Sequence, residues 1–120
     1  MHIQIMDNVR EVFFVGSSRK DLKAFPEAVQ DEMGYILYLV QCGDHHRAVK
    51  PFKGLNGVYE IKSDYDKDTY RLVYALKIGE NIYVLHAFMK KSKRGIKTPK
   101  EALEIIKHRY KIAVEHEKNG

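Results

Sequence analysis

The chain has 120 residues, of which 44% are hydrophobic and 31% charged. This composition and length are typical of one globular, soluble domain covering residues 1–120. No apolar run reaches the roughly 18 residues that a transmembrane helix needs, and the N-terminus lacks the basic and apolar regions of a signal peptide. The single cysteine, Cys42, excludes an internal disulfide framework and favours a reducing, cytoplasmic location.

Positive charge is concentrated near the C-terminus. Residues 1–89 carry 11 basic and 12 acidic side chains, whereas residues 90–120 carry 10 basic and 4 acidic ones. The whole basic excess therefore follows residue 89. Such a concentration of charge favours a partner that carries several phosphates.

The first half of the chain predicts a strand followed by two helices. Residues 11–15, Glu-Val-Phe-Phe-Val, are typical of a strand, and the alternation over residues 2–6 suggests a further edge strand. Ser18 can cap a short helix, which Pro26 interrupts. The next helix begins at Pro26 and ends near Gly43. Its apolar stripe consists of Val29, Met33, Ile36, Leu37 and Val40.

The second half predicts three strands and a helix. Residues 44–57 form a polar crossing segment, and the strands cover residues 58–62, 70–77 and 82–89. Polar and Gly-containing turns between the strands favour antiparallel connections. Thr98-Pro99-Lys100-Glu101 has the pattern of a capping box that begins the last helix. The buried stripe of that helix consists of Leu103, Ile106 and Tyr110.

The predicted order is β-α-α-β-β-β-α, an α+β domain with helices on one face of a small antiparallel sheet. Strand alternation places Arg71 on the face opposite Leu72 and Tyr74, which are the core-facing residues. A hairpin turn near residues 78–81 sets Arg71 opposite position 88. Arg71 should therefore lie close to the lysines that end the next strand.

The cations around this hairpin are the main candidates for function. Together they can hold a phosphate and stabilise additional negative charge in a transition state. The alternative is a solvated basic surface without a catalytic role. Tyrosines such as Tyr70 can stack on unpaired bases, although strands also favour tyrosine for packing. The candidate cations are Lys50, Lys53, Arg71, Lys90, Lys91, Lys93 and Arg94.

The histidines and the cysteine give weaker signals. His45 and His46 are adjacent, and no Cys or carboxylate stands at zinc-site spacing from them. The sequence therefore predicts no metal site and no cofactor. His86 lies in the middle of an apolar strand and is typical of a core histidine. Cys42 is typical of a small packing residue at a helix end.

Four stretches of the sequence resemble a known family. They are residues 16–26, residues 50–55 with 58–61, residues 70–74, and residues 83–93 together with Thr98-Pro99. They resemble the RelE/ParE superfamily of toxins. The closer resemblance is to the HigB-like, phage-derived host-inhibition branch of type II toxin–antitoxin systems. The resemblance covers most of the chain.

This resemblance implies a microbial-ribonuclease-like fold and, for many members, cleavage of mRNA in the ribosomal A site. The RNA's own 2′-OH would attack the phosphate without a metal, and a helix-turn-helix antitoxin would be the partner. The candidate catalytic residues are then Arg71, Lys90, Lys91 and Lys53. The candidate RNA-binding residues are Lys50, Lys93, Arg94 and Tyr70.

Two questions stay open at this point. RelE-type toxins often have a tyrosine shortly after the terminal cation, and Gly95-Ile96-Lys97 provides none. The groups that transfer protons could be a lysine pair or His86. Two other functions also fit, because some superfamily members poison DNA gyrase instead, and a basic RNA-binding accessory protein would have a similar charge pattern.

Overall fold

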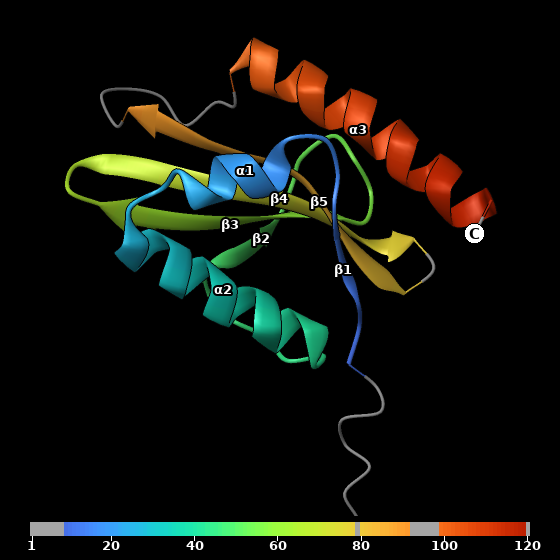
Figure 1. Ribbon diagram of the computed structural model, residues 1–120, viewed down its shortest axis with the longest axis horizontal. Helices are drawn as coiled ribbons and strands as arrows, with labels where there is room; N and C mark the ends of the chain where they lie inside the picture. The colour runs from blue at the N-terminus through green and yellow to red at the C-terminus, as the bar shows by residue number, and fades with distance from the viewer. Residues whose placement is uncertain (1–8, 79, 92–98, 120) are drawn as a thin grey trace, which may run out of the picture.

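The computed structural model describes residues 9–78, 80–91 and 99–119, with the backbone alone at residues 77, 78 and 91 (Figure 1). The strand suggested for residues 2–6 and the capping residue Thr98 lie outside these ranges. The described elements confirm the predicted α+β class. They are β1 (Val12–Phe14), α1 (Ser18–Lys23), α2 (Glu27–Gln41), β2 (Val49–Pro51), β3 (Val58–Tyr65), β4 (Asp68–Ile78), β5 (Asn81–Lys91) and α3 (Lys100–Asn119).

The strands form one mixed sheet in the order β1-β5-β4-β3-β2. β1 pairs with β5 in parallel, and the other neighbours are antiparallel. The prediction of a wholly antiparallel sheet was therefore wrong. β2 was also missed within residues 44–57, because it has three residues, ends in a proline and lies at the sheet edge.

Helices cover both faces of the sheet, so the prediction that they share one face was wrong. The first core cluster joins the predicted stripe of α2 to Leu72 and Tyr74 of β4. The second joins Ile106 of α3 to Val73 and Ala75 of the same strand. From Leu72 to Ala75, β4 is therefore apolar on both faces. Figure 1 shows α2 and α3 on opposite sides of the sheet. A strand that is buried on both faces needs a helix on each.

The β3–β4 hairpin is longer than the sequence suggested. Its turn lies at Asp66 and Lys67, which both have positive φ angles of 50° and 72°. Two such residues are typical of the tight turns that match the twist of paired strands. The register then places Lys62 opposite Arg71. On the other side of β4, Arg71 pairs with Phe88, which confirms the predicted register.

The turn between β1 and α1 is held by contacts from β5 and α3. Ser18, expected as a helix cap, is instead buried, and its hydroxyl donates to the Val84 carbonyl at 3.1 Å. The Arg109 guanidinium of α3 donates to the Leu85 carbonyl at 3.0 Å and to the Ser17 hydroxyl at 3.1 Å. Gly16 has φ +60°, and a Cβ at this position would lie 2.6 Å from the Arg109 Nε.

Two glycine substitutions test these contacts in opposite directions. Gly16→Ala should destabilise the protein by about 1–2 kcal/mol, because positive φ is unfavourable for alanine and Arg109 would have to move. Gly34→Ala is the matched control, since Gly34 is inside α2 and an added Cβ would meet nothing within 4 Å. It should stabilise the protein by about 0.5–1 kcal/mol. Urea unfolding measures both changes, and equal effects of the two substitutions would contradict this description of the turn.

Candidate active site

The sheet face under α3 has an apolar half and a polar half. On β3 the inward side chain changes from Val58 to Glu60, and on β4 it changes from Val73 to Arg71. The paired residues Lys62 and Arg71 continue the polar half. α3 covers the apolar half, so the polar residues lie beyond its packing contacts.

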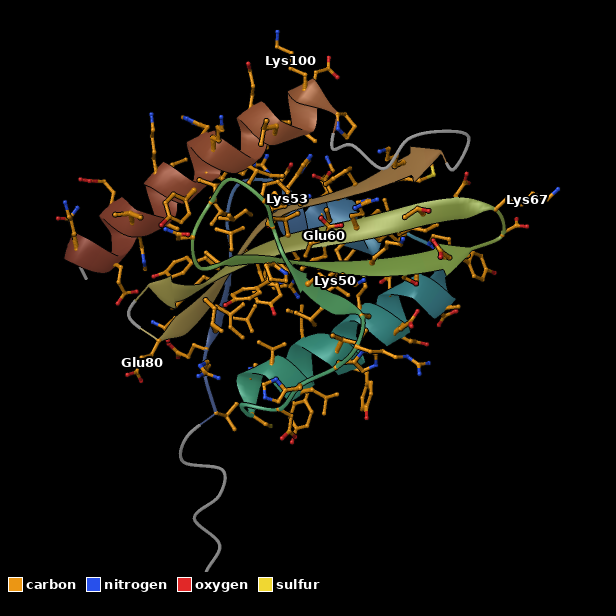
Figure 2. The ribbon with its side chains drawn as sticks, turned by 180° about the vertical axis from the view of Figure 1, so that it is seen from behind. Lys50, Lys53, Glu60, Lys67, Glu80 and Lys100 are labelled. Carbon is orange, nitrogen blue, oxygen red and sulfur yellow. The ribbon has the colours of Figure 1, made fainter. Side chains whose placement is uncertain are left out.

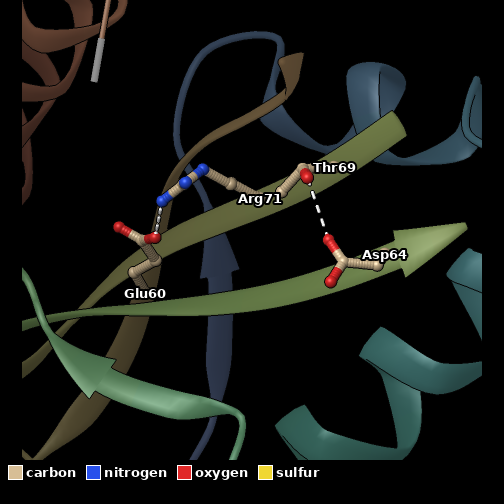
Figure 3. A network of polar contacts seen from close by, with 4 residues as sticks. All are labelled: Glu60, Asp64, Thr69 and Arg71. Atoms are coloured by element: carbon tan, nitrogen blue, oxygen red, sulfur yellow. Dashed lines mark hydrogen bonds and ion pairs between the residues drawn. The ribbon is translucent and has the colours of Figure 1, made fainter. Parts of the chain in front are cut away.

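An ion pair between Arg71 and Glu60 lies at the centre of the polar half (Figure 3). The side chains are 8% and 15% exposed, so both charges are largely removed from water. Arg71 Nε is buried and has no hydrogen-bond acceptor among the described residues. Beside this pair, the Thr69 hydroxyl donates to the Asp64 carboxylate at 2.9 Å. The guanidinium is therefore held in place by one carboxylate and retains a further N–H donor.

Lys90 of β5 belongs to the same group of charges. It pairs with Thr69 in the sheet, two residues from Arg71 along β4. Its pKa is lowered from the ordinary lysine value, first by burial and then by the positive charge of Arg71, while Glu60 partly opposes the shift. A lysine with a lowered pKa gives up its proton more readily near neutral pH. Arg71, Glu60 and Lys90 therefore form one electrostatically coupled cluster.

Two lysines from the segment before β3 border this cluster. Lys50 pairs with Glu60 across the β2–β3 ladder and is exposed. Figure 2 shows Lys50, Lys53 and Glu60 near the middle of the sheet, whereas Lys67 and Glu80 mark its two ends. Lys53 lies in the exposed loop between β2 and β3. Four of the candidate residues, Lys50, Lys53, Arg71 and Lys90, thus come from this one region.

The structure places Tyr70 on the other face of the sheet, whereas His86 lies on the same face as Arg71, in the row of Glu60 and Val73. Tyr70 is 8% exposed, belongs to the first core cluster and packs against Phe25 with ring centroids 4.9 Å apart. It faces away from Arg71 and is in no position to stack on a base there. His86 is 9% exposed and stacks on Phe88 at 4.9 Å. Burial, and then the charge of Arg109, lower the pKa of His86, so its imidazole stays neutral at physiological pH.

The remaining candidates fall outside what the structure describes. Lys93 and Arg94 lie between the described ranges, and the side chain of Lys91 is also outside them. Among the described residues, no group of His, Cys, Asp and Glu side chains is arranged to hold a metal ion. Within the same residues, no helix has the length and apolar character to cross a membrane.

Sequence reasoning missed Glu60 and Lys62. Both alternate with apolar residues in β3, and Glu60 lies diagonally across the ladder from Arg71. If a tight turn had been predicted at Asp66 and Lys67, the register between β3 and β4 would have followed from it. The segment was instead taken as a longer linker, because neither turn residue is glycine or asparagine. The opposite charges of Glu60 and Arg71 were the available signal.

The architecture is that of the RelE toxins. The RelE toxin of Escherichia coli, in the free state and with two arginines replaced by alanine, matches with a TM-score of 0.55 at 16% identity, over 87% of this chain and 97% of the other. A chain of the RelBE2 toxin–antitoxin complex of Mycobacterium tuberculosis matches with a TM-score of 0.49 at 19% identity, over 68% of this chain and 92% of the other. No curated protein matches the sequence significantly.

The family model of the phage-derived Gp49-like proteins matches residues 20–111. The chain therefore belongs to the Gp49-like family. This match and the RelE-like fold confirm the resemblance to the RelE superfamily and its phage-derived branch.

The coupling within the cluster can be measured through Lys90. Arg71→Ala removes a neighbouring positive charge and should raise the Lys90 pKa, whereas Glu60→Gln removes a negative charge and should lower it further. The measurement is an NMR titration of ¹³C-methylated lysines, with the Lys90 signal assigned from Lys90→Arg. Lys118→Ala, at the far end of α3, should leave this pKa unchanged. Unaltered Lys90 titration in both cluster variants would show that the three groups are not coupled.

Proposed function

We propose that this protein is the toxin of a type II toxin–antitoxin system and that it cleaves mRNA on the ribosome. The observation that carries the proposal is the buried Arg71 guanidinium, whose Nε has no acceptor among the described residues, beside Lys90 and Glu60. An unpaired buried N–H is unfavourable by roughly 1–3 kcal/mol, and more for a charged group. A phosphate oxygen is the kind of acceptor that this N–H lacks. The RelE-like fold and the Gp49-like family support the same reading.

The proposed reaction is attack of the RNA's 2′-OH on the adjacent phosphorus. The new P–O2′ bond forms while the bond from phosphorus to the 5′-oxygen breaks, giving a 2′,3′-cyclic phosphate and a 5′-hydroxyl. Arg71 stabilises the negative charge that develops on the phosphate oxygens. One preorganised donor of this kind contributes on the order of 10²-fold or more in rate.

Two proton transfers complete the reaction. Glu60 is the carboxylate beside Arg71 and can accept the proton of the 2′-OH. Lys90, with its lowered pKa, can donate a proton to the departing 5′-oxygen. We prefer these two groups to the lysine pair and His86, because Glu60 is paired directly with Arg71 and the His86 ring is stacked on Phe88. The protein thereby supplies charge and protons, while the substrate supplies the nucleophile.

The ribosome and the antitoxin are proposed as partners because the chain resembles the RelE toxins. The mRNA in the ribosomal A site is the proposed substrate, and the ribosome would hold its backbone against the cationic cluster. A helix-turn-helix antitoxin is the proposed partner, and its reading frame would adjoin that of the toxin. Co-expression of the neighbouring small protein should restore growth if it is the antitoxin.

The proposal predicts a specific pattern of variant activity. Expression of the wild type should arrest growth, and pulse labelling should show protein synthesis falling before DNA synthesis. Arg71→Ala and Glu60→Gln should each lower cleavage of ribosome-bound mRNA by about 10²-fold or more. Lys118→Ala also removes one charged side chain, but at the opposite end of the sheet, and should retain wild-type activity.

Three outcomes would contradict this function. DNA synthesis that stops first would favour inhibition of gyrase. Products with 5′-phosphates would indicate attack by water instead of the 2′-OH. Full toxicity of Arg71→Ala at matched expression, in a variant that thermal melting shows to be folded, would remove Arg71 from the reaction.

A further inference from the structure

A groove of about 790 Å³ lies between the β2–β3 loop and α3. Hydrogen bonds fix the loop at both ends. The Phe52 N–H donates to the Val58 carbonyl at 2.8 Å, and the Gly57 carbonyl accepts from the Leu76 N–H at 2.9 Å. The Phe52 side chain is 6% exposed and anchors the loop in the second core cluster. The groove is therefore formed by the fold itself.

The groove adjoins the candidate active site. Val58 lines it, and Glu60 follows two residues later on the same face of β3. Pro51 also lines it and directly follows Lys50, which pairs with Glu60. A strand advances about 3.3 Å per residue, so Val58 in the groove and Glu60 in the cluster are about two such steps apart. One nucleotide can span this distance.

The lining differs in chemistry from the cationic cluster. Among the described residues the lining has no charged member and consists of Pro51, Phe52, Gly54, Leu55, Asn56, Gly57, Val58, Tyr59 and Tyr110. Tyr110 provides an aromatic ring from α3, and Asn56 provides an amide with both a donor and an acceptor. The volume lies within the roughly 300–1,000 Å³ of small-molecule sites. An uncharged groove with aromatic rings and one amide suits a nucleobase, while the phosphate stays with the cations.

We propose that this groove binds the nucleobase that adjoins the scissile phosphate, with Tyr110 stacking on the base and Asn56 contacting its edge. The inference rests on the proposed function, because it needs an RNA phosphate at Arg71. It assigns base preference at the cut to the β2–β3 loop and α3. The catalytic cations cannot distinguish one base from another, because the phosphate is the same at every position of the RNA.

Cleavage of ribosome-bound mRNA by loop and α3 variants tests the groove. Tyr110→Leu should lower cleavage about 10-fold through lost stacking, whereas Tyr110→Phe keeps the ring and should stay near wild type. Asn56→Ala should lower cleavage next to the preferred base and broaden the distribution of bases next to the cut, as determined by sequencing the 5′-hydroxyl ends. Thermal melting checks that each variant is folded.

A photo-cross-linking arm locates the base directly. The probe is ribosome-bound mRNA with a 2′-deoxy nucleotide at the cut and 4-thiouridine beside it, and the cross-linked peptide should contain residues 51–59 or Tyr110. Cross-links elsewhere, or none, would overturn the inference. If wild type cleaves and these variants change neither rate nor base distribution, the groove assignment fails while the proposed function stands. If wild type does not cleave, both fail.

Discussion

The ion pair between Glu60 and Arg71 is the contact on which the polar half of the sheet depends. An arginine that is 8% exposed would be strongly unfavourable without a carboxylate beside it. Removal of one partner from such a pair typically destabilises a protein by about 3–5 kcal/mol. The pair exists because the tight β3–β4 turn fixes the register that places Glu60 diagonally across from Arg71. Turn geometry thus sets the position of the charge.

The two faces of the sheet explain why this charge lies outside the packing of α3. α1 and α2 cover one face, and α3 covers only the apolar half of the other. Both strands change from apolar to polar along this face, β3 between Val58 and Glu60, and β4 two residues further along the ladder, between Val73 and Arg71. The apolar half anchors α3 and the β2–β3 loop. The polar half contains Lys90 and Glu60, which lie near the guanidinium of Arg71.

The sequence predicted those features that depend on local pattern. The stripe of α2, the orientation of Arg71 and its pairing with Phe88 all follow from periodicity and one Gly-containing turn. The placement of α3 did not follow, because β4 is apolar on both faces and its alternation alone cannot assign a helix to either one. Pairing of β1 with β5 is a long-range contact between segments about 70 residues apart, which local pattern does not encode.

The candidate site was predicted in part for the same reason. The proximity of Arg71 and Lys90 was predicted because one hairpin joins their strands. Glu60 was missed because its relation to Arg71 depends on a tight turn at Asp66 and Lys67, and lysine is an unusual residue at positive φ. Tyr70 was assigned to RNA by residue type alone, and its strand position places it in the core with Phe25.

The most direct test of the account asks whether the RNA supplies its own nucleophile. An mRNA with a single 2′-deoxy substitution at the preferred cleavage position, bound in the ribosomal A site, is incubated with the wild-type protein. The account predicts that cleavage at that position disappears, while the unsubstituted message in the same reaction is cut normally. Continued cleavage at the 2′-deoxy position would contradict it, because the cluster of Arg71, Glu60 and Lys90 would then be activating water or another nucleophile.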